Sequence, residues 1–289
     1  MNSRPENRWA RSLTDVLGWS RPFQSNPSVI NDELFDMMRK AQIVLQTKVE
    51  EMYSWQCLVR MSTLDGELFL HSAYPTLTAD SVFFGPDTYR FARAIKAMLS
   101  ARDSTAPRVC RAVDIGCGAG PGAVLLAKNY PDAEVFGVDI NDAALQLTTI
   151  NASLANVKVT SRRSDLFNDI EGQFDLIISN PPYLVDASKR RYRHGGGALG
   201  SELSVAIVQT SCKRLAPGGT LLLYTGSAII NGQDLFLQEA KNVLDNSPLT
   251  WTYEEMDPDV FGEELSTDSY SHADRIAAVV LLATKPNSS

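Results

Sequence analysis

The chain has 289 residues, of which 44% are hydrophobic, 21% charged and 8% aromatic, and its formal net charge is −7. This composition is typical of a globular protein and excludes a collagen-like, low-complexity or largely disordered chain. The apolar runs are too short to span a membrane, and the polar N-terminus does not resemble a secretory signal. The four cysteines form no CxxC pair, which argues against a zinc site or a disulfide framework. We therefore expect a soluble cytoplasmic protein without a metal.

The negative charge is unevenly distributed along the chain. Residues 1–107 hold 12 basic and 12 acidic side chains, whereas residues 108–289 hold 15 and 22. A protein that grips nucleic acid without sequence preference is usually basic, because neutralising phosphates supplies most of that affinity. The charge therefore argues against such a role for the whole surface, but it does not exclude a local basic patch.

Residues 1–107 predict a smaller α+β domain with a candidate role in substrate recognition. We expect a helix from Asn31 to Glu51 with Asn31 as its N-cap, because apolar residues recur there at helical spacing. The Asp65-Gly66 pair lies between alternating runs and predicts a β-hairpin. A second helix is expected from Thr88 to Ala101, and the polar segment 102–107 is typical of a linker.

Residues 108–289 alternate between predicted strands and helices. We expect strands at 108–116, 133–140, 156–160, 173–179, 218–225, 249–256 and 275–284, and helices at 122–129, 143–154, 203–215 and 234–244. Repeated strand–helix units predict an α/β fold with a doubly wound, mainly parallel, seven-stranded sheet. The last two strands have no clear helix between them, so they are expected to pair antiparallel at the sheet edge. A ligand of such a sheet should bind at the carboxyl ends of its strands.

The first four predicted strands of this region each end in residues that suit a ligand site. Alternate glycines after the first strand let the backbone approach a ligand closely, and the next helix presents unpaired amides. A carboxylate after the second strand can accept both hydroxyls of a ribose. Each feature alone is commonly structural, but the ordered set indicates a function. The four features are the turn Asp114–Gly120, then Asp139, then Asp165 with Leu166, and finally the NPPY sequence Asn180–Tyr183.

On these residues, the region from Phe83 to Lys285 resembles class I methyltransferases that depend on S-adenosylmethionine. The resemblance implies a Rossmann-like fold in which the Asp114–Gly120 turn wraps the methionine part of the cofactor. It implies that Asp139 holds the ribose, with Ile140 beside the adenine. The cofactor-binding residues that follow from it are Asp114, Gly116, Cys117, Gly118, Gly120, Asp139, Ile140, Asp165, Leu166 and Asn180.

The NPPY motif is typical of the members that methylate an amide or exocyclic amine nitrogen, and its residues suit that chemistry. Such a nitrogen is a poor nucleophile because its lone pair is delocalised. The Asn180 side-chain carbonyl and the Pro181 backbone carbonyl can accept hydrogen bonds from its two N–H groups and direct the lone pair at the methyl group. Pro182 stiffens the loop, and Tyr183 offers a flat face to a planar group. We predict that these four residues are catalytic and that positioning supplies most of the rate.

A second resemblance concerns the segment Val82–Tyr89. It is similar to the segment that precedes the cofactor domain in methyltransferases that modify the glutamine of peptide release factors. There an apolar pair is followed by Arg-Pro-(Asp/Glu)-Thr-Glu. Here Gly85 replaces the arginine and Tyr89 replaces the glutamate. The run from Gly196 to Leu203 agrees loosely with that branch. The N-terminal section instead is closer to ribosomal-RNA guanine methyltransferases with an extra N-terminal domain.

A basic segment, Lys189–Gly197, follows NPPY directly. One interpretation is a mobile lid that contacts phosphates or an acidic protein surface, with Tyr192 available to stack. The other is a solvated loop whose charges only keep it soluble. The predicted substrate contacts are Phe84, Pro86, Asp87, Tyr183, Arg191 and Arg193.

The favoured hypothesis is methyl transfer from S-adenosylmethionine to a planar nitrogen of a macromolecular acceptor, with a protein glutamine side chain as the first choice. An RNA or DNA base is the alternative, and a small-molecule acceptor stays open. A second hypothesis is a non-catalytic cofactor-binding module, which a broken turn or a lost Asn180 would favour. A third is a nicotinamide oxidoreductase, because Gly118–Ala123 fits the dinucleotide pattern, but this hypothesis gives NPPY no role.

Overall fold

The computed structural model describes residues 9–49, 52–76, 78–102, 106–186, 190, 192–197 and 199–287. The N-terminal part contains α1 (Leu13–Leu17), α2 (Asp32–Lys40), β1 (Val44–Val49), β2 (Met52–Cys57), β3 (Val59–Leu64), β4 (Glu67–Ser72) and α3 (Pro86–Ala101). The alternating part contains β5 (Arg111–Ile115), α4 (Pro121–Asn129), β6 (Glu134–Asp139), α5 (Asp142–Leu154), β7 (Thr160–Arg163), β8 (Phe174–Ser179) and α6 (Glu202–Arg214). The C-terminal part contains β9 (Leu215–Ile230), β10 (Gln233–Asp234), α7 (Leu235–Leu244), β11 (Thr250–Asp257), the 3₁₀ helix η2 (Gly262–Ser266) and β12 (Arg275–Thr284).

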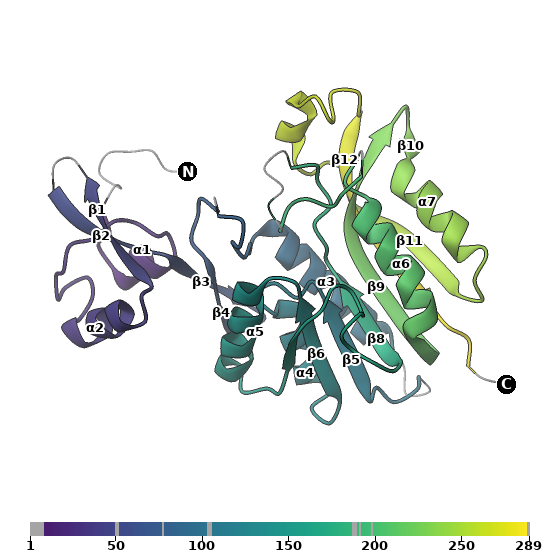
Figure 1. The fold of residues 1–289 in the computed structure, drawn as a ribbon, viewed down its shortest axis with the longest axis horizontal. Helices are drawn as coiled ribbons and strands as arrows, with labels where there is room; N and C mark the ends of the chain where they lie inside the picture. Colours follow the sequence, from purple (N-terminus) through teal and green to yellow (C-terminus); the bar gives the residue numbers. More distant parts are fainter. Residues whose placement is uncertain are drawn as a thin grey trace.

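The large sheet has the strand order β11-β12-β9-β8-β5-β6-β7, and the short β10 pairs with β9 (Figure 1). The strands from β5 to β9 pair in parallel. In contrast, β12 runs antiparallel to both β9 and β11. The predicted α/β class and the antiparallel pair at the edge are therefore confirmed.

Helices cover both faces of this sheet. Helices α3, α4 and α5 pack on one face, and α6 and α7 pack on the other (Figure 1). Neighbouring strand residues alternate between the two faces. Ala112 and Ile178 pack in the core with α3, α4 and α5, whereas Val113 and Ile177 pack in the core with α6 and α7. Because successive strand side chains point to opposite faces, a strand that is buried on both faces reads as a continuous apolar run.

Two predicted elements differ from the structure. The helix that begins after its N-cap Asn31 ends at Lys40, and β1 follows, so the predicted helix to Glu51 is wrong. Gln42 has a φ of 57°, which stops the helix, and the β-branched residues that follow pair with β2. The predicted strand 156–160 lies instead at Thr160–Arg163, because its pairing with β6 sets the register.

The β3–β4 hairpin turns at Asp65-Gly66 as predicted, and it packs on the large sheet domain. Leu64 and Phe69 belong to the same core as α3, α4 and α5. A separate core lies in the first part of the chain, which stands apart from the main body in Figure 1. Its buried residues are Ala10, Val16, Phe23, Ile30, Phe35, Met38 and Cys57. The division at residue 107 stays a prediction, and this packing leads us to propose a boundary near Leu58 instead.

Asn151 of α5 joins the hairpin to the first turn of the sheet domain. Its buried amide accepts a hydrogen bond from Leu70 N–H at 2.8 Å and donates to the carbonyls of Leu70 and Ala119 at 2.9 and 2.8 Å. Replacing Asn151 with Ala leaves these backbone groups without partners, and we expect the free energy of unfolding to fall by about 3 kcal/mol. Urea denaturation measures this loss. The exposed Asn246 makes one hydrogen bond, to Asn242, so Asn246→Ala is the control and should change the value by less than about 0.5 kcal/mol.

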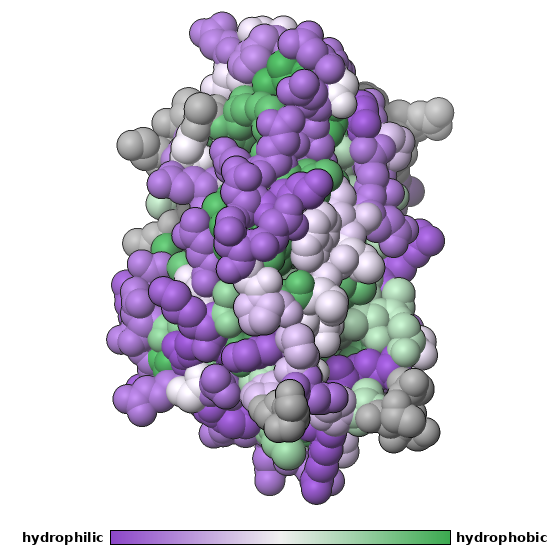
Figure 2. All heavy atoms as spheres, turned by 90° about the vertical axis from the view of Figure 1, so that its right-hand side faces the viewer, coloured by the Kyte–Doolittle hydropathy of each residue, from purple (hydrophilic) through white to green (hydrophobic). Residues whose placement is uncertain are grey.

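The side of the molecule that carries α7 is largely hydrophilic, with hydrophobic residues visible only in places (Figure 2). The exposed large hydrophobic side chains found in the described ranges all precede Ala155 in the chain. Among the described residues, no helix has the length and apolar character that crossing a membrane requires.

Candidate functional site

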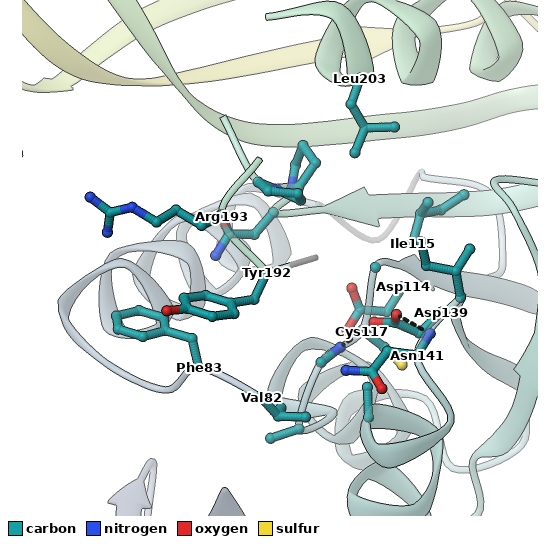
Figure 3. A pocket seen from close by; sticks show the side chains of 18 of the residues that line it. Val82, Phe83, Asp114, Ile115, Cys117, Asp139, Asn141, Tyr192, Arg193 and Leu203 are labelled. Atoms are coloured by element: carbon teal, nitrogen blue, oxygen red, sulfur yellow. Dashed lines mark hydrogen bonds between the residues drawn. The ribbon is translucent and has the colours of Figure 1, made fainter. Parts of the chain in front are cut away.

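A cavity lies at the carboxyl ends of β5, β6 and β8, where a ligand of a doubly wound sheet is expected. Its wall contains residues from the β5–α4 turn, the end of β6, the segments after β7 and β8, and the segment before α3. In Figure 3, Asp114, Cys117, Asp139 and Asn141 lie together on one side, whereas Phe83 and Tyr192 lie on another. The cavity therefore has a polar side and an aromatic side.

The turn after β5 has the backbone that its glycines predict. Gly116, Gly118 and Gly120 have φ values of 69°, 56° and 81°, which residues with a side chain rarely adopt. A Cβ at Gly120 would lie 2.9 Å from the side chain of Thr148, so the turn is also too tight there for any other residue. Cys117 is buried, and burial raises the pKa of its thiol well above the ordinary value. The turn lines the cavity mainly with backbone.

Asp114, at the end of β5, is buried in the wall of the cavity. Its Oδ2 accepts a hydrogen bond from Ala123 N–H at 2.9 Å, and its Oδ1 has no hydrogen-bond partner among the described residues. Burial, with a smaller contribution from the charge of Asp139, raises the pKa of this carboxyl to about 8. A buried acceptor of this kind is suited to a ligand that brings a donor or a positive charge.

Asp139, at the end of β6, is held by the backbone around it. Its Oδ1 accepts from Asn141 N–H at 2.9 Å and its Oδ2 accepts from Gly118 N–H at 3.1 Å. The predicted neighbours Ile140, Asp165 and Leu166 also line the cavity, and Ile140 is 43% exposed. All of the residues predicted from the resemblance to hold a cofactor lie in this wall except Gly120, whose neighbours Ala119 and Pro121 do.

The NPPY loop forms the wall of the cavity beyond β8. Asn180 is half-buried there, and among the described residues nothing donates to its side-chain carbonyl or to the Pro181 carbonyl. Tyr183 is 6% exposed, and its hydroxyl donates to Asp87 Oδ2 at 2.7 Å. Burial and the nearby Asp87 carboxylate raise the pKa of Tyr183 well above its ordinary value, so the hydroxyl stays protonated. The loop thus brings to the cavity two acceptors that no described residue occupies.

The predicted substrate contacts divide into three groups. Asp87, Tyr183 and Arg193 line the cavity. Phe84 does not, because its ring packs in the core against Phe69 and His71, and Pro86 is exposed at the start of α3 away from the cavity wall. Arg191 lies outside the described residues.

The described part of the basic segment is paired with acidic side chains rather than solvated. Arg190 pairs with Asp186, and the hydrogen bond between them raises the pKa of Arg190 above its ordinary value, although partial burial acts in the opposite direction. Arg193 pairs with Glu264, and its guanidinium lies over the ring of Phe261. In Figure 3 the Arg193 side chain points away from Asp114 and Asp139. These two arginines are thus neutralised within the protein.

Several cavity residues were not identified from the sequence as site residues. Phe83 adjoins the predicted Phe84 and its ring lies parallel to that of Tyr192, with 6.1 Å between the centroids. Leu203 reaches the cavity from α6. Phe261 comes from the β11–β12 connection, with a φ of 55°, and its ring contacts Tyr183 edge-on. Phe83 had a sequence signal in its place inside the Val82–Tyr89 segment, and Leu203 in its place at the end of the Gly196–Leu203 run, whereas Phe261 had none.

Residues 91–243, more than half of the chain, match the family described as methyltransferase small domain. A ribosomal protein uL3 glutamine methyltransferase of Neisseria meningitidis is 35% identical over 130 residues, 41% of this chain and 43% of that protein. A release factor glutamine methyltransferase of Koribacter versatilis is 36% identical over 139 residues, 43% and 50% of the two chains. A 4-amino-L-phenylalanine/4-methylamino-L-phenylalanine methyltransferase of Streptomyces pristinaespiralis is 33% identical over 156 residues, which are 49% of this chain and 52% of that protein. The chain thus spans about half the length of these relatives or less.

Solved structures share the fold at low sequence identity. The T. thermophilus 16S rRNA N2 G1207 methyltransferase in complex with AdoMet and guanosine superposes with a TM-score of 0.50 at 18% identity, over 88% of this chain and 61% of that chain. The M. jannaschii TYW2 in complex with AdoMet superposes with a TM-score of 0.51 at 14% identity, over 78% of this chain and 85% of that chain. These similarities concern the fold alone, which is the Rossmann-like sheet that the sequence predicts.

Proposed function

Since the chain belongs to the methyltransferase small domain family, we propose that it transfers a methyl group from S-adenosylmethionine to a planar nitrogen, with a protein glutamine side chain as the acceptor. One observation carries the proposal. Asn180 and Pro181, whose carbonyls accept no hydrogen bond from any described residue, line the same cavity as Asp114 and Asp139. A nitrogen held by the first pair is therefore close to a cofactor held by the second pair.

The residues of the polar side fit the cofactor. Asp114 Oδ1 is a buried acceptor that no described residue pairs with, which suits the positively charged amino end of S-adenosylmethionine. The glycine turn leaves room for the methionine part, because a Cβ built at Gly116 has no described atom within 4 Å apart from those of its chain neighbours. Asp139 is fixed to accept the ribose hydroxyls, and Ile140, Asp165 and Leu166 hold the adenine. The bound cofactor supplies a methyl group that its sulfonium already activates.

The NPPY loop acts by holding the acceptor nitrogen. Asn180 and Pro181 accept its two N–H groups, so its lone pair turns out of conjugation and toward the methyl group. The step needs no strong base, because the nitrogen is positively charged once it is methylated and then loses its proton readily to water. Most of the rate therefore comes from orientation rather than from acid–base chemistry.

Three observations favour a protein glutamine as the acceptor. Two of the relatives are glutamine methyltransferases by name, at 35% and 36% identity. Arg190 and Arg193 are paired with Asp186 and Glu264, so they are not available to contact phosphates. The net charge of −7 also disfavours a polyanion. An uncharged carboxamide is compatible with the aromatic side of the cavity.

A nucleic-acid base is the second candidate. The observation that favours it is the extent of the fold similarity to the 16S rRNA methyltransferase, which covers 88% of this chain. Its planar exocyclic amine offers the same two N–H groups to Asn180 and Pro181. The separate N-terminal unit, with its exposed Trp19 and Tyr53, is our candidate for recognising either macromolecule. The free cysteines suit a reducing cytoplasmic compartment.

The class of acceptor can be tested directly. The purified protein and tritiated S-adenosylmethionine are added to extract from cells that lack the gene, and the product is divided between protease and nuclease. Label released by protease is the expected result, and its recovery in methylglutamine after complete enzymatic digestion, which leaves the side-chain amide intact, would establish the acceptor. Label released by nuclease would support the second candidate, and label resistant to both would indicate a small molecule. The Asn180→Ala protein serves as the background control.

A further inference from the structure

The carboxylate of Asp87 joins three parts of the molecule beside the cavity. Asp87 stands in the first turn of α3 and is 6% exposed. Its Oδ2 accepts from the Tyr183 hydroxyl and its Oδ1 from the Tyr224 hydroxyl, both at 2.7 Å. Arg90, on the same helix, pairs with Asp87 and with Asp257. The carboxylate thus binds donors from the NPPY loop, the sheet and its own helix.

Tyr183 has little freedom to move once this hydrogen bond is made. A Cβ built at Gly226 would lie 2.2 Å from the Tyr183 ring, so the ring packs directly on the backbone of β9. The ring of Phe261 contacts it edge-on, with 5.9 Å between the centroids. With its ring packed and its hydroxyl bonded, Tyr183 is held at a single position.

The position of Tyr183 is transmitted to the two acceptor carbonyls. Only Pro181 and Pro182 separate Tyr183 from Asn180, and a proline ring fixes φ near −65°. On the other side of the motif, Ser179 is held in the sheet, and its hydroxyl donates to the Ile115 carbonyl at 2.7 Å. A short stiff segment that is fixed at both ends has little slack, so a shift of Tyr183 moves the carbonyls with it.

We propose that Asp87 is a positioning residue for the methyl transfer, and that it acts through Tyr183 to fix the carbonyls of Asn180 and Pro181. The inference rests on the proposed function. It gives Asp87 a role other than substrate contact, because its carboxylate is occupied by the protein's own donors.

Two variants test the link. In Asp87→Asn the amide offers one acceptor oxygen in place of two, so one tyrosine hydroxyl loses its acceptor. Tyr183→Phe removes the hydroxyl and keeps the ring. We expect kcat to fall by about tenfold or more in each variant, since misplacement by a fraction of an ångström is costly in a reaction driven by orientation. The KM for the acceptor and the Kd for S-adenosylhomocysteine should change by less than about twofold.

Tyr253→Phe is the matched control. It removes an equivalent hydrogen bond, from the Tyr253 hydroxyl to Asp234 at 2.6 Å, on the opposite face of the sheet. It should lower stability to a similar degree while kcat stays near the wild-type value. Thermal unfolding and the stoichiometry of S-adenosylhomocysteine binding report the folded fraction of every variant.

The double variant Asp87→Asn/Tyr183→Phe distinguishes positioning from general destabilisation. If Asp87 acts through Tyr183, the double variant has about the kcat of the slower single variant. Effects that multiply, or single variants whose kcat matches that of Tyr253→Phe, would overturn the inference. Failure of the proposed function is a different result: the wild-type protein would then methylate no acceptor, or Asn180→Ala would stay active.

Discussion

Replacing Asn180 with Ala is expected to lower kcat by about a thousandfold, because the substrate nitrogen loses an acceptor that holds it in the reactive orientation. The side chain makes no hydrogen bond to another described residue, so its removal leaves no partner unsatisfied within the protein. We therefore expect stability and the Kd for S-adenosylhomocysteine to stay close to the wild-type values. Single-turnover transfer of a labelled methyl group, together with calorimetric titration of S-adenosylhomocysteine, measures both quantities.

Asn242→Ala is the control for the loss of an amide side chain, since Asn242 is exposed on α7 and far along the chain from the motif. Its kcat should equal that of the wild-type protein. An Asn180→Ala protein that retains wild-type kcat would contradict the mechanism. A protein that loses cofactor binding in parallel with transfer would instead assign Asn180 to the cofactor site.

Cofactor affinity is expected to depend on pH through Asp114. In the unliganded protein burial raises the pKa of this carboxyl to about 8, and a positively charged ligand favours its ionised form. Binding must then release a proton below pH 8, so affinity is full above pH 8 and weakens as the pH falls. Between pH 7.5 and pH 6.0 the Kd for S-adenosylhomocysteine should rise by about twentyfold. Calorimetric titration across this range, in buffers of different ionisation enthalpy, measures the Kd and the proton release together.

Asp114→Asn should bind the ligand weakly and with little dependence on pH, because the amide keeps an acceptor for Ala123 but cannot ionise. Asp175→Asn is the control: it alters a carboxylate at the opposite end of the same sheet, where Asp175 accepts from the N–H groups of Cys110 and Arg111. It should keep the wild-type pH profile. A wild-type Kd that is constant from pH 6.0 to 7.5 would rule out this role for Asp114.

The same pKa shift affects stability with a defined sign. The folded-state pKa of Asp114 lies above its ordinary value of 3.8, so the unliganded folded protein binds a proton that the unfolded chain does not. This contribution to stability is complete below about pH 4 and is lost as the pH rises through 8. The free energy of unfolding of the wild-type protein should therefore fall relative to that of Asp114→Asn as the pH approaches 8.

The family and the polar side of the cavity could be predicted from the sequence because both depend on local patterns. The alternation of apolar runs and helical periods specifies a parallel sheet, and parallel strands bring their carboxyl ends to one edge. Asp114 and Asp139 lie at the ends of strands, and Asp165 and Asn180 come just after strands. Their order along the chain was therefore enough to group them. The family match over residues 91–243 confirms the methyltransferase resemblance that these residues carried.

Local patterns thus predict the class of fold, the edge of the sheet that holds the site, and the residues at the ends of its strands. Which neighbouring side chains face the cavity depends on how remote segments pack. Phe84 is in the core while Phe83 lines the wall, Asp87 bonds Tyr183 across 96 residues, and Arg193 is neutralised by Glu264 across 71. These partners are far apart along the chain, and contacts between remote segments depend on packing that no local pattern encodes.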